Sequence, residues 1–283
     1  MVQRRAQTVA PTPAPECSSP KTRDDLADAI SSALESTGSL VLCDRTKVKF
    51  SPSDDHIKVG KLNGGSEALS LSVSCEDGGS CVVNGDKDRT WRGKGGFMRV
   101  SGGAGVSFTG IKFTDFSASG DGGTFLLDGV ADSTFTKCVF LDGTTDKCGG
   151  AVAIIGTRVT FNDCDFRRND ASEGGGVCAE EESVVKFISS DFRANSAIKT
   201  GGAVHASSSK ISFEKRARFR SNTAGKMGGA GYFNDSTVEY QGPRIFWFRR
   251  NQAGECPDFD FDGDEDGCGD EMRRLSSSSQ GDL

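Results

Sequence analysis

Apolar and polar residues alternate in short blocks along most of this chain, and glycines separate the blocks. Residues 57–59, 69–75 and 81–85 alternate with a period of two, which predicts strands with one buried face. Residues 22–37 differ, because their apolar side chains recur at helical spacing behind Thr22, a common N-cap residue. The pattern therefore predicts many short strands joined by tight turns, and one amphipathic helix followed by a strand at 39–43.

The second half of the chain repeats one unit, in which a double glycine is followed by a strand-like triplet and then by Phe-Arg-x-Asn. The double glycines, with weaker copies upstream, begin at Gly95, Gly122, Gly149, Gly174, Gly201 and Gly228, so their spacings are 27, 27, 25, 27 and 27 residues. Repeats of this length indicate stacked units that each contact only their neighbours.

Overlaying the repeats gives columns of like residues. One apolar column holds Val106, Ser133, Val159, Val185, Ile211 and Val238; the next holds Phe108, Phe135, Phe161, Phe187, Phe213 and Tyr240; a third holds Phe113, Phe140, Phe166, Phe192, Phe219 and Phe248. We expect these columns to face inward. A chemically mixed column, which contains Arg99, Leu126, Ala153, Cys178, His205 and Tyr232, is expected to face outward, with His205 as an ordinary surface residue.

Units of 25–27 residues with three short strands and glycine at the corners predict a right-handed parallel β-helix of about six to seven coils. An asparagine column, formed by Asn169, Asn195, Asn222 and Asn251, is predicted to form a hydrogen-bonded ladder at one corner. The expected organisation is a disordered linker at 1–16, an N-terminal cap at 17–56 with the helix across the end of the stack, the β-helix at 57–255, and an acidic tail at 256–283.

The pairing of Gly-Gly-Ala-Val with Phe-x-x-Asn resembles the repeats of polymorphic outer membrane proteins and, more broadly, the right-handed β-helix proteins of the pectin-lyase-like superfamily. The resemblance covers roughly residues 57–251. It implies the fold but not one activity, since that superfamily includes polysaccharide lyases, hydrolases and esterases as well as adhesins and other non-catalytic binding proteins.

The charge distribution and the cysteine content indicate the compartment of the protein and exclude some classes of partner. The net charge of −6 is concentrated in 258–271, which disfavours a nucleic-acid partner attracted by bulk charge. No apolar run is long enough for a transmembrane helix, and 1–16 lacks the apolar stretch of a signal peptide. Ten cysteines without a zinc-ligand spacing indicate disulfides and hence an extracellular or cell-surface protein, which we expect to be a monomer.

Three cysteine pairs near unit edges are candidate disulfides: Cys17 with Cys43, Cys75 with Cys81, and Cys256 with Cys268. Cys138 and Cys164 share an inward column on adjacent coils, so they form either a fourth disulfide or a stacked pair of buried thiols. Cys148 and Cys178 differ by five residues in their position along the unit, and the sequence does not say how they pair.

The strongest exposed feature is an arginine column formed by Arg167, Arg193, Arg220 and Arg249, directly after the inward phenylalanine of each unit. Stacked like charges repel each other and so favour bound anions, and arginine suits carboxylate or sulfate groups. Two residues earlier lie Asp165, Asp191, Arg218 and Trp247 on the same strand face. The sequence therefore predicts a non-enzymatic protein that binds or adheres to an acidic polysaccharide or glycoprotein through this column.

The sequence leaves two alternatives open. A polysaccharide lyase or glycoside hydrolase would need clustered carboxylates and a basic residue, and Asp163, Asp165 and Asp191 beside the arginines are the only candidates. The residue signatures of the related galacturonan hydrolases are missing. The chain could also be a purely structural repeat segment of a larger surface protein.

A candidate calcium site lies in the acidic tail. Asp258, Asp260, Asp262 and Asp264 alternate as in the first half of a calcium loop, and a bond between Cys256 and Cys268 would close that loop. The match to an EF-hand then ends, because Gly269 stands where the last carboxylate ligand belongs.

Overall fold

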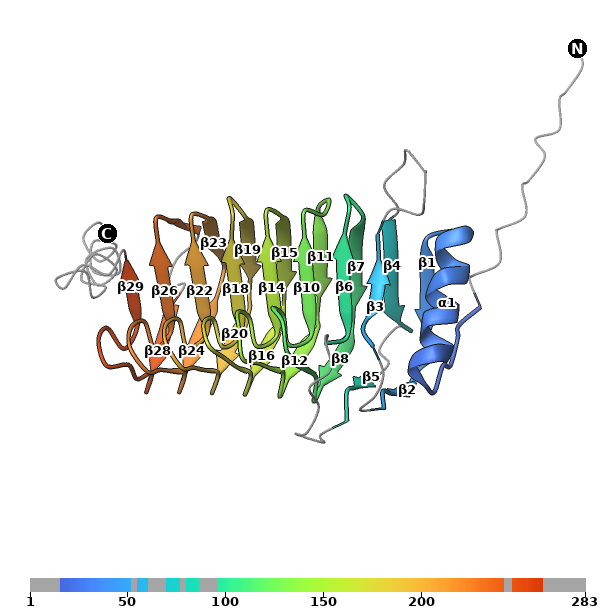
Figure 1. Cartoon of the computed structure of the whole chain (residues 1–283), viewed down its shortest axis with the longest axis horizontal. Helices are drawn as coiled ribbons and strands as arrows, with labels where there is room; N and C mark the ends of the chain where they lie inside the picture. The colour runs from blue at the N-terminus through green and yellow to red at the C-terminus, as the bar shows by residue number, and fades with distance from the viewer. Residues whose placement is uncertain are drawn as a thin grey trace, which may run out of the picture.

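The computed structural model describes residues 16–51, 55–60, 70–76, 80–86, 96–241 and 246–261. These residues form a parallel β-helix of about six turns, with one α-helix at its N-terminal end (Figure 1). The predicted fold class is therefore confirmed. Within the described part of the chain, no helix has the length and apolar character needed to cross a membrane.

Three long sheets form the sides of the solenoid, and all of their strand pairs are parallel. Sheet A contains β1 (Ser39–Leu42), β4 (Ser70–Cys75), β7 (Gly105–Thr109), β11 (Ser133–Thr136), β15 (Arg158–Asn162), β19 (Val184–Ile188), β23 (Lys210–Glu214) and β27 (Thr237–Gln241). Sheet B contains β2 (Lys47–Lys49), β5 (Cys81–Asn84), β8 (Ile111–Thr114), β12 (Val139–Leu141), β16 (Asp165–Arg167), β20 (Asp191–Arg193), β24 (Ala217–Arg220) and β28 (Phe246–Arg249). Sheet C contains β3 (Ile57–Val59), β6 (Met98–Ser101), β10 (Phe125–Asp128), β14 (Val152–Ile155), β18 (Val177–Glu180), β22 (Val204–Ser207), β26 (Gly231–Asn234) and β29 (Phe259–Phe261).

A fourth, narrow sheet adds a strand that the sequence pattern did not predict. Sheet D contains the two-residue strands β9 (Ser117–Ala118), β13 (Thr144–Thr145), β17 (Asp170–Ala171), β21 (Ser196–Ala197) and β25 (Thr223–Ala224). A two-residue strand shows too little alternation to be recognised as a period. Each of the central coils therefore has four strands rather than three.

The predicted phenylalanine columns stack through the core. Phe161 pairs in register with Phe187, and Phe166 pairs with Phe192 on the next sheet. The Phe166 and Phe192 rings lie 4.9 Å apart at an interplanar angle of 5°. These side chains are almost fully buried, so each coil supplies the apolar surface that its neighbours cover.

The turn before each double glycine folds back over the strand that follows it. Gly201 has a φ of +67°, and a Cβ atom at this position would collide with the carbonyl oxygen of Val204. Only glycine fits where a left-handed backbone conformation and a close backbone approach coincide. The double glycine is therefore explained by the fold alone.

The asparagine column forms the predicted ladder. The Asn195 side-chain amide donates to Oδ1 of Asn222 at 3.0 Å and to the carbonyl oxygen of Phe166 at 3.0 Å, and Asn195 Oδ1 accepts from the Asn169 amide at 2.9 Å. Asn251, in the last coil, donates to Asp258 Oδ1 at 3.2 Å. The ladder thus ends on a carboxylate that takes the place of the next asparagine.

Helix α1 (Arg23–Glu35) covers the N-terminal end of the stack (Figure 1). Thr22 and Asp25 form a capping box, in which the Thr22 side chain accepts from the Asp25 backbone and the Asp25 carboxylate accepts from Thr22 N. Leu26 and Ile30 are buried against β1 and β4. The predicted capping helix is confirmed, with ends one to two residues inside the expected range.

Two of the predicted disulfides are present, between Cys17 and Cys43 and between Cys75 and Cys81. A third joins Cys148 to Cys178 with a Cα–Cα distance of 5.6 Å. Cys148 lies in the turn that folds back over sheet C, and this brings it to a cysteine five positions further along the unit in the next coil. That fold-back explains the pair left unassigned by the sequence.

For the other four cysteines, the structure corrects one predicted disulfide and leaves another as a prediction. Cys138 and Cys164 are free, buried thiols, so the structure supports the stacked-thiol alternative and not a fourth disulfide between them. Cys256 is disulfide-bonded, whereas Cys268 lies outside the described residues.

Candidate functional site

The Phe-Arg-x-Asn segment places one arginine at the C-terminal end of each of the last four sheet B strands, β16, β20, β24 and β28. In β20, Phe192 points into the core and Arg193 is exposed, as expected for neighbouring residues of a strand. Ala194 then adopts a φ of +54°, which turns the chain so that Asn195 enters the buried ladder. The ladder thereby fixes the strand end from which the arginine side chain projects.

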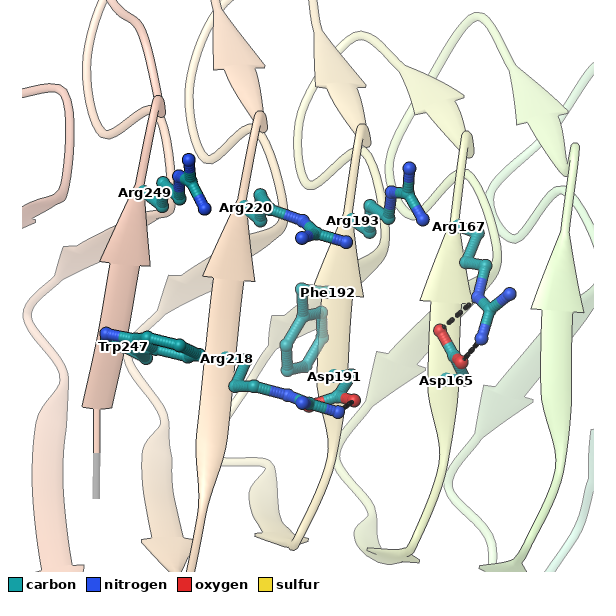
Figure 2. A pocket seen from close by; sticks show the side chains of 9 residues that line it. All are labelled: Asp165, Arg167, Asp191, Phe192, Arg193, Arg218, Arg220, Trp247 and Arg249. Carbon is teal, nitrogen blue, oxygen red and sulfur yellow. Dashed lines mark hydrogen bonds and ion pairs between the residues drawn. The ribbon is translucent and has the colours of Figure 1, made fainter. Parts of the chain in front are cut away.

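Two parallel rows of side chains result on the outer face of sheet B (Figure 2). The first row is the predicted arginine column: Arg167, Arg193, Arg220 and Arg249. The second row, two residues earlier in each strand, holds Asp165, Asp191, Arg218 and Trp247. Since neighbouring strands lie ~4.8 Å apart, the first row presents one guanidinium per coil along roughly 15 Å of the solenoid axis.

The two rows line a shallow groove of about 190 Å³. Its lining residues are Asp165, Arg167, Asp191, Phe192, Arg193, Arg218, Arg220, Trp247 and Arg249. All four arginines predicted as ligand-binding residues are therefore brought together in one concave site.

Both groove carboxylates are already paired. Arg167 holds Asp165 of its own strand through two hydrogen bonds, one of them 2.7 Å between Nε and Oδ1. Arg218 holds Asp191 of the preceding coil in the same bidentate way, with Nε 2.6 Å from Oδ1. The hydrogen bonds to these carboxylates raise the pKa of both arginines.

Three arginines of the groove have no partner for their charge in the described part of the chain. Among the described residues, the side chains of Arg193, Arg220 and Arg249 have no hydrogen bond or ion pair. Five arginines against two aspartates leave the groove with a charge of +3, although the chain as a whole carries −6. A cationic strip on an acidic protein is suited to binding an extended anion.

Trp247 gives the groove an aromatic surface at its C-terminal end. Its side chain is 68% exposed in β28, beside Arg218 of the neighbouring strand. An exposed indole costs hydrophobic free energy unless a ligand covers it, and it offers a flat apolar face together with one N–H donor. The repeat columns predict that Trp247 lies on this face, but they do not predict a role for it.

Of the three carboxylates considered for catalysis, only Asp165 and Asp191 lie together, as cross-strand neighbours in the groove. Asp165 and Asp191 are held in the ion pairs described above, while Asp163 sits at an exposed corner with a φ of +52° and does not line the groove. No histidine, lysine or tyrosine lines this groove among the residues that the structure describes.

The predicted calcium loop is only partly described. Asp262 and Asp264 lie outside the described residues. Asp258 accepts the last amide of the asparagine ladder, and Asp260 is buried in β29 opposite Tyr232. The calcium site therefore stays a prediction, in which Asp258 would have to serve both the ladder and the ion.

His205 was predicted to face solvent, and this prediction is wrong. Its side chain is buried beneath the fold-back turn, with Nδ1 2.9 Å from Thr200 Oγ1 and Nε2 4.0 Å from a Glu173 carboxylate oxygen. Burial lowers the pKa of His205. Ala153 and Cys178 of the same column are also buried, because the turn covers this stretch of sheet C.

No protein-family model and no curated protein sequence matches this chain. Among solved structures, it is similar to the crystal structure of an alginate lyase from Paenibacillus sp. str. FPU-7. The two share 14% sequence identity with a TM-score of 0.39, over 78% of this chain and 96% of the other. A likeness of this size does not indicate what this chain binds.

Proposed function

We propose that this chain is a non-enzymatic, secreted or cell-surface protein that binds acidic polysaccharide through the groove on sheet B. The observation that carries the proposal is the set of unpaired guanidinium groups of Arg193, Arg220 and Arg249 on consecutive coils. Arginine binds carboxylate and sulfate groups bidentately, and the groove already does so twice with its own aspartates.

The scaffold favours a long, repetitive ligand. The arginines stand on strands of a stacked core whose ends are held by the buried ladder, so the backbone that carries them is already ordered before binding. The row runs along the solenoid axis, and a linear polymer carrying regularly spaced anions matches that arrangement. Trp247 supports a sugar because its exposed face can cover the apolar side of a pyranose ring.

Binding is favoured over polysaccharide cleavage by the chemistry of the groove. A lyase or hydrolase needs a group that is free to move a proton at the bond to be broken. Asp165 and Asp191 both accept two hydrogen bonds from an arginine, so the oxygen atoms of both carboxylates are already engaged by a guanidinium group. The disulfides fit an oxidising, extracellular compartment.

The test is binding to immobilised polygalacturonate and alginate, with and without calcium, while unsaturated and reducing ends are monitored. We expect saturable binding that weakens with salt, is strongly reduced by Arg193→Ala with Arg220→Ala, and yields no product. Arg158→Ala is the matched control, since Arg158 pairs with Asp132 at the start of sheet A strands, away from the groove. Product formation would refute the non-enzymatic proposal, and binding unchanged in the double variant would refute the groove.

A further inference from the structure

We propose that Asp191 determines which polyanions the groove prefers. Because of Asp191, the groove prefers polymers with anions along one edge to more densely charged polymers with anions along both edges. This inference rests on the proposed binding function and adds a specificity-determining residue to it. Its basis is the unequal charge of the two rows that line the groove (Figure 2).

The first row carries four positive charges, one on each of Arg167, Arg193, Arg220 and Arg249. The second row carries two carboxylates and one guanidinium, which gives it a charge of −1. A polyanion lying in the groove therefore meets a cationic edge on one side and a slightly acidic edge on the other. Anions projecting toward the second row approach the carboxylates of Asp165 and Asp191 and are repelled.

Asp191 controls this asymmetry because it holds the only cation of the second row. Its carboxylate accepts from Arg218 Nε at 2.6 Å and from a second guanidinium nitrogen, across neighbouring coils. Both partners are partly exposed, with 23% and 39% of their side chains accessible, so a ligand can reach them. Neutralising Asp191 would free Arg218 and change the charge of the second row from −1 to zero.

Neutralising Asp165 would also bring the second row to zero charge, but it would free an arginine of the first row and not of the second. Asp165 binds Arg167, which belongs to the first row of the same strand. Neutralising Asp165 would strengthen the edge that is already cationic, whereas neutralising Asp191 creates a second site for anions. The two substitutions therefore remove the same charge and are expected to differ in their effect on selectivity.

The experiment compares affinities for two probes, polygalacturonate with one carboxylate per sugar and dextran sulfate with several sulfates per sugar. In the Asp191→Asn variant, we expect affinity for dextran sulfate to rise by about three- to tenfold more than affinity for polygalacturonate, as expected for one added charge-assisted contact. Asp132→Asn, which removes an equal charge from the exposed pair with Arg158, is expected to leave the ratio unchanged. Adding Arg218→Gln to Asp191→Asn is expected to abolish the gain.

The outcomes are distinct. A ratio that does not change in Asp191→Asn, or that changes equally in Asp132→Asn, overturns the inference while leaving the binding function intact. A gain that survives Arg218→Gln also overturns it, because the gain would then come from net charge and not from the freed guanidinium. If the wild-type protein binds neither polymer, the binding function itself is refuted, and the selectivity with it.

Discussion

The side-chain amide of Asn195 donates a 3.0 Å hydrogen bond to Oδ1 of Asn222 on the next coil. Each of these asparagines follows an arginine of the groove by two residues, so the contact joins the strand ends that carry Arg193 and Arg220. The spacing of the exposed charges is therefore set by a buried amide contact, and the same residue pair contributes to stability and to the geometry of the site.

Replacing Asn195 by alanine is expected to destabilise the protein by about 3 kcal/mol, because the substitution removes the buried hydrogen bonds of the Asn195 side chain with Asn169, Asn222 and Phe166 and takes away the acceptor of the Asn169 backbone N–H. The measurement is urea unfolding followed by circular dichroism. Asn162→Ala is the matched control, since Asn162 lies at the partly exposed end of β15. Equal losses in the two variants would show that the ladder contributes nothing beyond ordinary packing.

The repeat columns predict the core and the arginine row because a parallel β-helix converts a fixed sequence spacing into a neighbour contact. They do not predict which arginines are free. Asp165 bonds an arginine of its own strand, whereas Asp191 bonds one on the next coil, although the two occupy the same column. Side-chain direction within a column depends on local contacts that the spacing does not contain.

The sequence pattern also did not predict that side chains such as His205 are buried beneath the fold-back turn. His205 lies in a column that alternation assigns to the outer face, and the turn that covers it is placed by the left-handed conformation of Gly201. The equivalent turn before Gly149 accounts for the disulfide between Cys148 and Cys178. A period-two pattern reports only which side of a strand a residue occupies, and it contains no information about what covers that side.

The double glycine is expected to tolerate alanine poorly at its first position. Gly201→Ala meets both an unfavourable φ of +67° and a collision with the backbone of Val204. Gly129→Ala has a φ of +56° but open space around its Cβ, so it isolates the conformational cost of about 1 kcal/mol. We expect Gly201→Ala to lose clearly more stability in urea unfolding. Similar losses would mean that the turn shifts to accommodate the methyl group.

The buried histidine predicts a pH dependence of stability. Burial lowers the pKa of His205 in the folded state, against the opposing effect of Glu173, whereas a histidine in the unfolded chain has a pKa of about 6.5. Above pH ~6.5 the imidazole is neutral in both states and contributes no slope. As the pH falls below this value, the unfolded state binds a proton that the folded state does not, so stability decreases.

The measurement is urea unfolding at pH 7.5 and pH 5.5 for the wild type and for His205→Gln. Glutamine does not titrate in this range, so the variant should lose less free energy of unfolding between the two pH values. Comparing the variant with the wild type cancels the contributions of the carboxylates elsewhere in the chain. An equal loss in both proteins would show that His205 is protonated as readily in the folded state as in the unfolded state.

Cys164 is expected to accept serine at little cost. Its thiol lies 3.3 Å from the carbonyl oxygen of Phe135, and on the next coil the Ser190 hydroxyl makes the equivalent 3.3 Å contact with Phe161. A hydroxyl at position 164 would therefore meet the same acceptor, and we expect Cys164→Ser to lose less than about 1.5 kcal/mol. Cys164→Ala removes the donor while keeping the site small, and it separates the hydrogen bond from the packing.

The two buried thiols, Cys138 and Cys164, are expected to react slowly in the folded protein. Burial raises the pKa of Cys164 well above its usual range, so little reactive thiolate forms, and the solenoid wall shields both sulfur atoms. In the folded protein we expect Cys138 and Cys164 to resist an alkylating reagent, and in urea without reductant we expect both to react. Mass spectrometry of the alkylated peptides measures this directly. Peptides containing 138 and 164 joined by a disulfide would contradict the thiol assignment, and rapid alkylation of the native chain would show that the core opens at these coils.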